Sequence, residues 1–92
     1  NLNRALPETL DAAVDTSTWT IPSTFRVLAE AGAVAPLEMF RAFNMGVGMV
    51  VITAPDKVRE ITSRAAACGI DAWECGHVIP GTGHVRLDGV VT

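Results

Sequence analysis

The sequence predicts an α+β fold, in which a mixed β-sheet is packed with helices. The spacing of apolar residues changes along the chain between two, which is typical of strands, and three to four, which is typical of helices. Proline and glycine mark most of these changes. Apolar residues make up 49% of the 92 residues and charged residues only 18%. This composition excludes intrinsic disorder and indicates a single small core. With so few charged residues, part of the surface is expected to be apolar and covered by another surface.

The N-terminal half is expected to contain one strand and two helices. Residues 1–6 are expected to be the end of a helix, and the alternation over residues 9–15 predicts a half-buried strand. A helix then begins at Pro22 and stops at Gly32. A second short helix begins at Pro36, and the two helices are expected to form a helical hairpin.

The C-terminal half is expected to contain three strands and one helix. Residues 49–53 are apolar at nearly every position, which predicts a central strand covered on both faces. A helix is expected from Pro55 to Gly69. Residues 70–79 and 84–88 are expected to be strands that pair as an antiparallel hairpin.

Charge and hydropathy exclude two classes of partner. Seven Lys and Arg residues against ten Asp and Glu residues give a net charge of −3, whereas a nucleic-acid-binding domain is usually basic. The longest apolar run, near residues 47–52, is far shorter than the roughly 20 residues that span a bilayer. Cys68 and Cys75 are too few for a disulfide framework, so we expect free thiols and a cytoplasmic protein.

No catalytic residue can be named from the sequence alone. Cys75, His77 and His84 lack the spacing of a zinc motif, so no metal site is expected. No nucleophile, histidine and acid recur at a recognisable spacing, and no two carboxylates are paired for acid–base catalysis. Trp19 and Trp73 are expected to lie in the core.

Two polar features could bind a ligand. The segment Asn44–Gly48 contains Gly46 and Gly48, but it lacks the lysine and the following helix of a phosphate-binding P-loop. Its glycines permit close approach of a backbone or a ligand, so a structural turn and a ligand-facing loop both remain open. Arg4 could hold a phosphate or carboxylate by a bidentate contact, or it could simply cover its own helix.

Several segments resemble one family in the same order along the chain. Residues 1–7 (N-L-N-R-A-L-P) are similar to the family pattern N-[LI]-P-R-[VA]-L-P, although Asn3 replaces the usual proline. Residues 38–49 (E-M-F-R-A-F-N-M-G-V-G-M) are similar to E-M-x-R-T-F-N-M-G-[IV]-G-M, although Phe40 stands where Tyr is common. Shorter similarities cover residues 19–22, 25–26 and 72–78. The chain thus resembles the C-terminal domain of the phosphoribosylformylglycinamidine cyclo-ligase (aminoimidazole ribonucleotide synthetase) family.

The resemblance implies an ATP- and Mg²⁺-dependent ligase of purine biosynthesis, which converts formylglycinamidine ribonucleotide to aminoimidazole ribonucleotide. In that family an N-terminal domain supplies most of the nucleotide and metal site and forms a homodimer, and the C-terminal domain closes the cleft. We therefore expect residues 1–92 to be one C-terminal domain of a larger two-domain enzyme, inactive alone. Carried over onto this sequence, the resemblance implies that Asn1, Arg4, Asn44, Gly46 and Gly48 bind the substrate phosphate or the transferring phosphoryl group.

Two alternatives stay open. The first is the same domain from a sister ATP-dependent enzyme, such as a selenophosphate synthetase, a thiamine-monophosphate kinase or a hydrogenase-maturation protein. The loop at residues 43–49 (F-N-M-G-V-G-M) favours the cyclo-ligase, because these sisters vary most there. The second alternative is a stand-alone α+β ligand-binding module.

Overall fold

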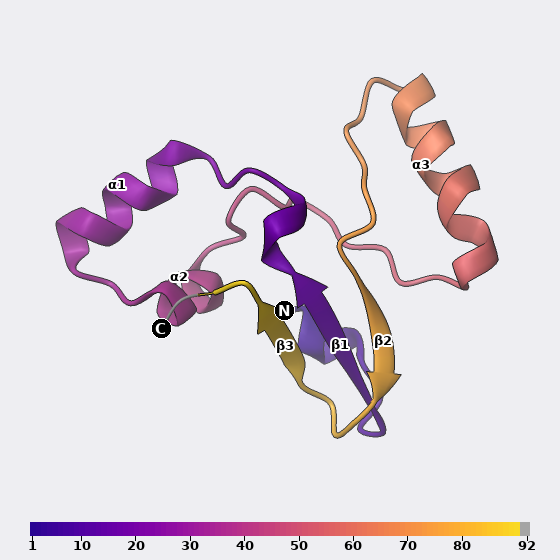
Figure 1. Ribbon diagram of the computed structural model, residues 1–92, viewed down its shortest axis with the longest axis horizontal. Helices are drawn as coiled ribbons and strands as arrows, with labels where there is room; N and C mark the ends of the chain where they lie inside the picture. The colour runs from indigo at the N-terminus through magenta and orange to yellow at the C-terminus, as the bar shows by residue number, and fades with distance from the viewer. Residues whose placement is uncertain (91–92) are drawn as a thin grey trace.

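A computed structural model describes residues 1–90. They form a small sheet with the helices at its periphery (Figure 1). Within residues 1–90 the strands and α-helices are β1 (Leu10–Asp15), α1 (Ser23–Gly32), α2 (Pro36–Ala42), α3 (Val58–Ala67), β2 (Gly76–Pro80) and β3 (Val85–Asp88). Short 3-10 turns cover Leu2–Ala5, Thr16–Thr18 and Pro55–Lys57. The predicted α+β class with a mixed sheet is therefore confirmed. None of the helices described is long and apolar enough to cross a membrane.

Strand β1 is the centre of the sheet, whose strand order is β2-β1-β3. It runs antiparallel to β2, with Ala13 opposite His77, and parallel to β3, with Ala13 opposite Arg86. Ala12, Ala13 and Val14 are all buried. Three consecutive buried residues fit a strand with neighbours on both edges and cover on both faces.

The expected hairpin of the last two strands is wrong, because β1 lies between them. The connection from β2 to β3 crosses the start of β1, where the Gly81 amide donates to Thr9 and the Gly83 amide to Leu10 at 2.9 and 3.0 Å. Asp11 completes this connection, since its Oδ1 accepts the amides of Thr82 and His84 at 2.9 and 2.8 Å. Alternation identified the two strands, but it carries no information about which strand each one pairs with.

The expected central strand at residues 49–53 is also wrong. This segment forms no strand and its side chains are exposed; Met49 is 83% exposed and Val51 58% exposed. An apolar run predicts burial, but burial as a strand needs neighbours on both edges, and β1 holds the central position in the sheet. The segment therefore leaves apolar surface uncovered.

The three helices lie near their expected places. The left-handed residue that ends α1 is Ala33, with φ of 51°, one position after the expected stop at Gly32. Helices α1 and α2 form the expected hairpin, and the rings of Phe25 and Phe43 pack with their centroids 5.8 Å apart. Helix α3 stands apart from the sheet in Figure 1, and its expected apolar face is at most half-buried.

Two expected elements are shorter or tighter than predicted. Residues 1–6 form a 3-10 turn over Leu2–Ala5 rather than the end of an α-helix. The strand expected over residues 70–79 starts only at Gly76, where pairing with β1 begins. Trp73 therefore lies in a connecting segment before the strand, and this places it at the functional site described below.

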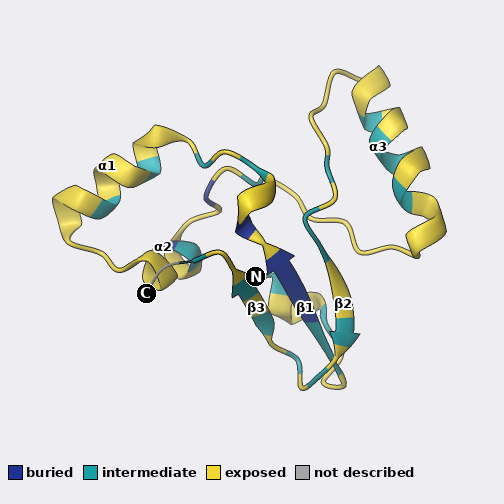
Figure 2. Ribbon diagram, viewed as in Figure 1, coloured by how far each residue is buried: buried dark blue, intermediate teal, exposed yellow. Residues whose placement is uncertain are grey.

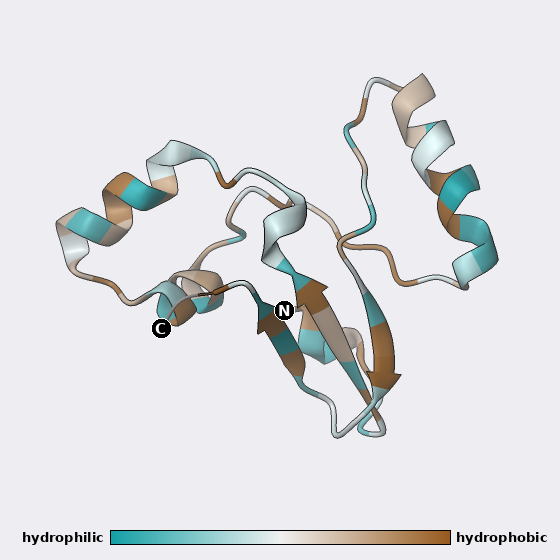
Figure 3. Ribbon diagram, in the orientation of Figure 1, coloured by the Kyte–Doolittle hydropathy of each residue, from teal (hydrophilic) through white to brown (hydrophobic). Residues whose placement is uncertain are grey.

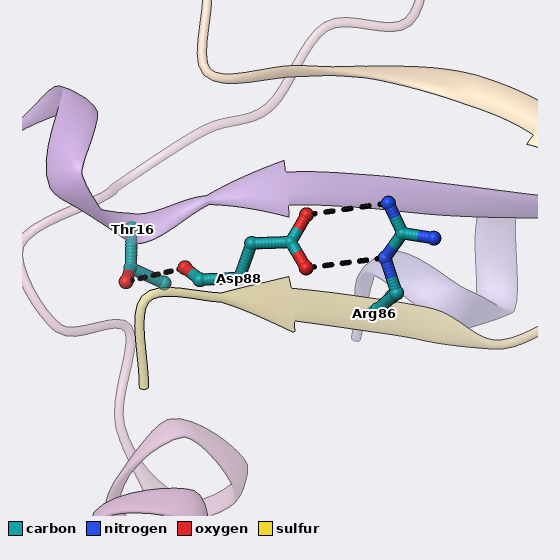
Figure 4. Close-up of polar contacts among 3 residues, drawn as sticks. All are labelled: Thr16, Arg86 and Asp88. Carbon is teal, nitrogen blue, oxygen red and sulfur yellow. Dashed lines mark hydrogen bonds and ion pairs between the residues drawn. The ribbon is translucent and has the colours of Figure 1, made fainter. Parts of the chain in front are cut away.

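Burial is concentrated in two places, the middle of β1 and the region around Met39 and Met45 (Figure 2). Figure 3 shows hydrophobic stretches in all three strands, whereas α1 and α3 alternate between hydrophobic and hydrophilic residues. At the end of the sheet the buried Thr16 donates its hydroxyl to the Asp88 carbonyl at 2.8 Å (Figure 4). The Arg86 guanidinium pairs with the Asp88 carboxylate at 3.2 and 3.3 Å. The Thr16 bond joins the end of β1 to the end of β3, whereas the Arg86–Asp88 pair lies within β3.

Candidate functional site

The segment Asn44–Gly48 is a tight turn held by its own polar groups. The Asn44 side-chain Oδ1 accepts the Gly46 amide at 2.8 Å, and the Val47 amide donates to the Asn44 carbonyl at 3.0 Å. Met45 and Gly46 both adopt left-handed backbone angles, with φ of 54° and 99°. An asparagine side chain that bonds to the backbone two residues later is a common way to build such a turn. Both the side-chain oxygen and the main-chain oxygen of Asn44 therefore accept hydrogen bonds from within the turn.

Trp19 and Pro22 hold this turn from the opposite side. The Trp19 indole N–H donates to the Met45 carbonyl at 3.1 Å, and Met45 itself is buried. A Cβ on Gly46 would lie 2.6 Å from the Pro22 Cδ, so this position requires glycine for both its backbone angle and its surroundings. Gly48 differs, because a Cβ there would meet nothing within 4 Å.

An open pocket of about 510 Å³ lies beside the turn. Its lining combines aromatic, hydroxyl, carboxylate and backbone groups: Thr18, Trp19, Thr20, Pro22, Gly46, Asp71 and Trp73. The rings of Trp19 and Trp73 have their centroids 6.1 Å apart and are tilted by 40°. Pockets that combine aromatic walls with a few polar groups are the usual form of small-molecule sites. We refer to this cavity as the tryptophan pocket.

The indole nitrogens of the two tryptophans differ in their partners. Trp19 donates to the turn, whereas the Trp73 Nε1 is buried and has no hydrogen-bond partner among the described residues. A buried donor without an acceptor costs about 1–3 kcal/mol. The indole N–H of Trp73 is therefore left without a hydrogen bond, whereas the indole N–H of Trp19 has one.

The structure brings together only some of the residues that the sequence singled out. Gly46 lines the tryptophan pocket, and Asn44 shapes the turn that presents it. Gly48 follows in the same segment but does not line the pocket. Asn1 and Arg4 are exposed at the Leu2–Ala5 turn, and neither lines the pocket.

The tryptophan pocket was not predicted from the sequence, because both tryptophans were expected to lie in the core. Each is only partly buried. One signal was available for Trp19, which stands in a polar segment with no apolar periodicity to carry it into a core. Asp71 and Trp73 gave no comparable signal, since they join Trp19 only through the folded backbone.

A second hollow of about 380 Å³ shares Thr18 with the tryptophan pocket. Its lining is acidic and includes Asp15, Glu74 and Asp88, together with Cys75 and His77. Hydrogen bonds from the Ser17 hydroxyl and then the Ser17 amide lower the pKa of Asp15 below its ordinary value. Within the described part of the chain, no three Asp, Glu, His or Cys side chains gather closely enough to hold a metal ion. Cys75 and Cys68 are both free thiols.

Comparisons with known proteins now give the family. Residues 1–88 match the family model described as AIR synthase related protein, C-terminal domain. The chain is 39% identical over 90 residues to a phosphoribosylformylglycinamidine cyclo-ligase of Xanthomonas oryzae pv. oryzae, covering 96% of this chain and 26% of that protein.

Two further proteins with the same name are similar to this chain. The one from Bifidobacterium animalis subsp. lactis is 43% identical over 79 residues, which is 86% of this chain and 23% of that protein. The one from Pseudothermotoga lettingae is 36% identical over 81 residues, which is 88% of this chain and 24% of that protein. The chain thus spans about a quarter of the length of the curated relatives it matches. On the family match over residues 1–88, the chain belongs to the C-terminal domain family of AIR synthase related proteins.

Proposed function

We propose that this chain acts as the C-terminal domain of a phosphoribosylformylglycinamidine cyclo-ligase, the ligase of purine biosynthesis that closes an imidazole ring. The substrate would be formylglycinamidine ribonucleotide and the product aminoimidazole ribonucleotide. The observation that carries the proposal is the identity of 36–43% to three relatives of this name over most of the chain. The same observation favours the cyclo-ligase over its sister enzymes and over a stand-alone binding module.

ATP and Mg²⁺ belong to the proposal, but the described residues do not fit a Mg²⁺ site. They form no cluster of three metal-ligating side chains, and the glycine turn lacks the P-loop lysine. We therefore place ATP and Mg²⁺ mainly on an N-terminal domain of the complete enzyme. Contact with that domain, a homodimer and a cytoplasmic location are part of the same proposal.

Arg4 and the Asn44–Gly48 turn would face the cleft between the two domains. Arg4 is exposed, and a guanidinium can bind a phosphate through two parallel N–H contacts. The turn presents backbone groups in left-handed conformations next to the tryptophan pocket. In this arrangement the substrate phosphate or the transferring phosphoryl group would contact the five residues assigned to it, Asn1, Arg4, Asn44, Gly46 and Gly48.

A domain exchange tests the proposed function. The segment of the Xanthomonas oryzae relative that matches this chain is replaced by residues 1–92, and the chimera is assayed for ADP release that depends on formylglycinamidine ribonucleotide. We expect the chimera to catalyse the reaction and the chain alone to turn over no ATP. A folded chimera without activity, or ATP turnover by the chain alone, would contradict the proposal.

Substitution of Arg4 in the chimera tests its assigned role. Arg4→Ala should raise the KM for the ribonucleotide substrate about tenfold, because a charge-assisted phosphate contact is lost. Arg59→Ala removes an equally exposed guanidinium from α3 and should leave the kinetics unchanged. Equal kinetics for Arg4→Ala and the parent chimera would remove Arg4 from the site.

A further inference from the structure

The tryptophan pocket has the charge of a cation site rather than of a phosphate site. Among its described lining residues, Asp71 is the only one with an ionisable side chain, and none is Lys or Arg. A carboxylate attracts a cation and repels a phosphate in the same cavity. Phosphate sites in proteins usually supply arginine or lysine, and this lining has neither. Its one feature that favours an anion is Pro22, the N-cap of α1, which places the start of that helix at the edge of the pocket.

The two indoles add a second attraction for a cation. A positive group within about 6 Å of an aromatic centroid is drawn to the ring face, and Trp is the strongest of the aromatic residues in this respect. Trp19 and Trp73 are tilted by 40° rather than stacked face to face, and both are only partly buried. Ring surface is therefore available beside Asp71. A planar cation gains most from such walls, because it can lie flat against a ring while its N–H groups reach the carboxylate.

We infer that the tryptophan pocket is a subsite for a planar cation of the amidinium class. The identification of its occupant rests on the proposed function, whose substrate carries an amidine group. Asp71 would accept the amidine N–H groups, and Trp19 or Trp73 would cover its plane. The Gly46 turn would then lie beside the bound amidine.

The intrinsic fluorescence of the chain reports on this pocket alone. The sequence contains two tryptophans and no tyrosine, and both tryptophans line the pocket. The chain is titrated with acetamidinium chloride at constant ionic strength, and parallel titrations use acetamide and inorganic phosphate. Acetamide has nearly the same shape without the charge. We expect saturable quenching by acetamidinium and none by acetamide or phosphate.

Asp71→Asn tests the carboxylate, and Asp56→Asn is its matched control. Both aspartates are exposed, and Asp56 lies in the 3-10 turn before α3, outside the pocket. Asp71→Asn should weaken acetamidinium binding about threefold or more, as expected for loss of one exposed charge pair. Asp56→Asn should leave binding unchanged, and the unliganded emission maximum of each variant shows that the indoles keep their environment.

Three results would overturn the inference. They are equal quenching by acetamide and acetamidinium, tighter binding of phosphate, and unchanged acetamidinium binding by Asp71→Asn. These results leave the domain exchange untouched, so failure of the subsite is distinguishable from failure of the cyclo-ligase function. If the chimera is inactive but acetamidinium binding is charge-selective, the pocket still prefers cations, and the cyclo-ligase substrate is no longer its assigned occupant.

Discussion

Two regions of this molecule carry similar apolar residues and bury them to very different extents. One region comprises β1, α2 and the Asn44–Gly48 turn (the glycine turn), and it holds the buried hydrophobic residues of the described chain, among them Met39 and Met45. The other region is residues 49–70, which contain an apolar run and an amphipathic helix that leave most of their surface exposed (Figure 2). The difference shows that apolar side chains favour burial but do not produce it by themselves. Burial itself requires a partner surface, and β1 has strands on both edges whereas residues 49–53 have none.

The largest expected effect compares two methionines, one from each region. Met39 is 1% exposed and Met49 is 83% exposed. Met39→Ala should lower the free energy of unfolding by about 2–4 kcal/mol, because it leaves a cavity in the packed region. Met49→Ala should change it by less than about 0.5 kcal/mol, as surface substitutions do. Urea unfolding followed by circular dichroism measures both values.

An equal loss in the two methionine variants would break the comparison. It would mean that residues 49–53 are covered in solution by a surface that the described residues do not supply. The same measurement at several protein concentrations then tells whether that surface belongs to another molecule, since association makes stability depend on concentration.

The next largest effect compares two glycines of the glycine turn, Gly46 and Gly48. Gly46→Ala should destabilise the chain by about 1–3 kcal/mol, because its φ is 99° and its new Cβ would press on Pro22. Gly48→Ala should cost less than about 0.5 kcal/mol, since nothing lies within 4 Å of a Cβ there. Thermal unfolding of the two variants checks the difference. Equal costs would show that Trp19 and Pro22 do not hold the turn as described.

The smallest effect concerns acid stability at the crossing from β2 to β3. Hydrogen bonds from the backbone amides of His84 and Thr82 lower the pKa of Asp11 below its ordinary value. The folded pKa is thus below the unfolded one, so this stabilisation is complete above the ordinary pKa and is lost as the pH falls through the lowered pKa. Asp11→Asn should lower the thermal midpoint at neutral pH and reduce its loss in acid.

The control for this pH effect is Asp56→Asn. Asp56 is exposed, and its side chain makes no hydrogen bond among the described residues. The Asp56→Asn variant should therefore follow the parent chain from neutral pH into acid. An acid transition that is identical in the parent and in Asp11→Asn would mean that Asp11 does not stabilise the crossing.

Sequence periodicity predicted the elements of the fold well and their neighbours poorly. The three helices and the strands β1 and β3 lie close to their expected bounds, because local spacing and the flanking prolines determine them. The place of β1 between β2 and β3 depends on contacts between the start and the end of the chain. No local pattern reports such contacts, and therefore both the hairpin and the central strand at 49–53 were predicted wrongly.

The site shows the same division between local and long-range information. The turn at Asn44–Gly48 was foreseen, because asparagine and glycine impose it locally. The tryptophan pocket was not, since it joins Trp19, Gly46 and Trp73 from three separate parts of the chain. Whether Asn1 and Arg4 bind a ligand stays a prediction that the kinetic experiment addresses.

The central position of β1 also has a consequence for how the chain folds. Both partners of β1 lie beyond residue 75, so the sheet forms only by closing a loop that contains all three α-helices. Long loops make closure entropically costly and folding slow. During synthesis β1 emerges before either of its partners and stays unpaired until residues 76–88 have left the ribosome. We therefore expect the step that limits formation of the sheet to be the meeting of β1 with β2 and β3, whereas the helices between them can form beforehand.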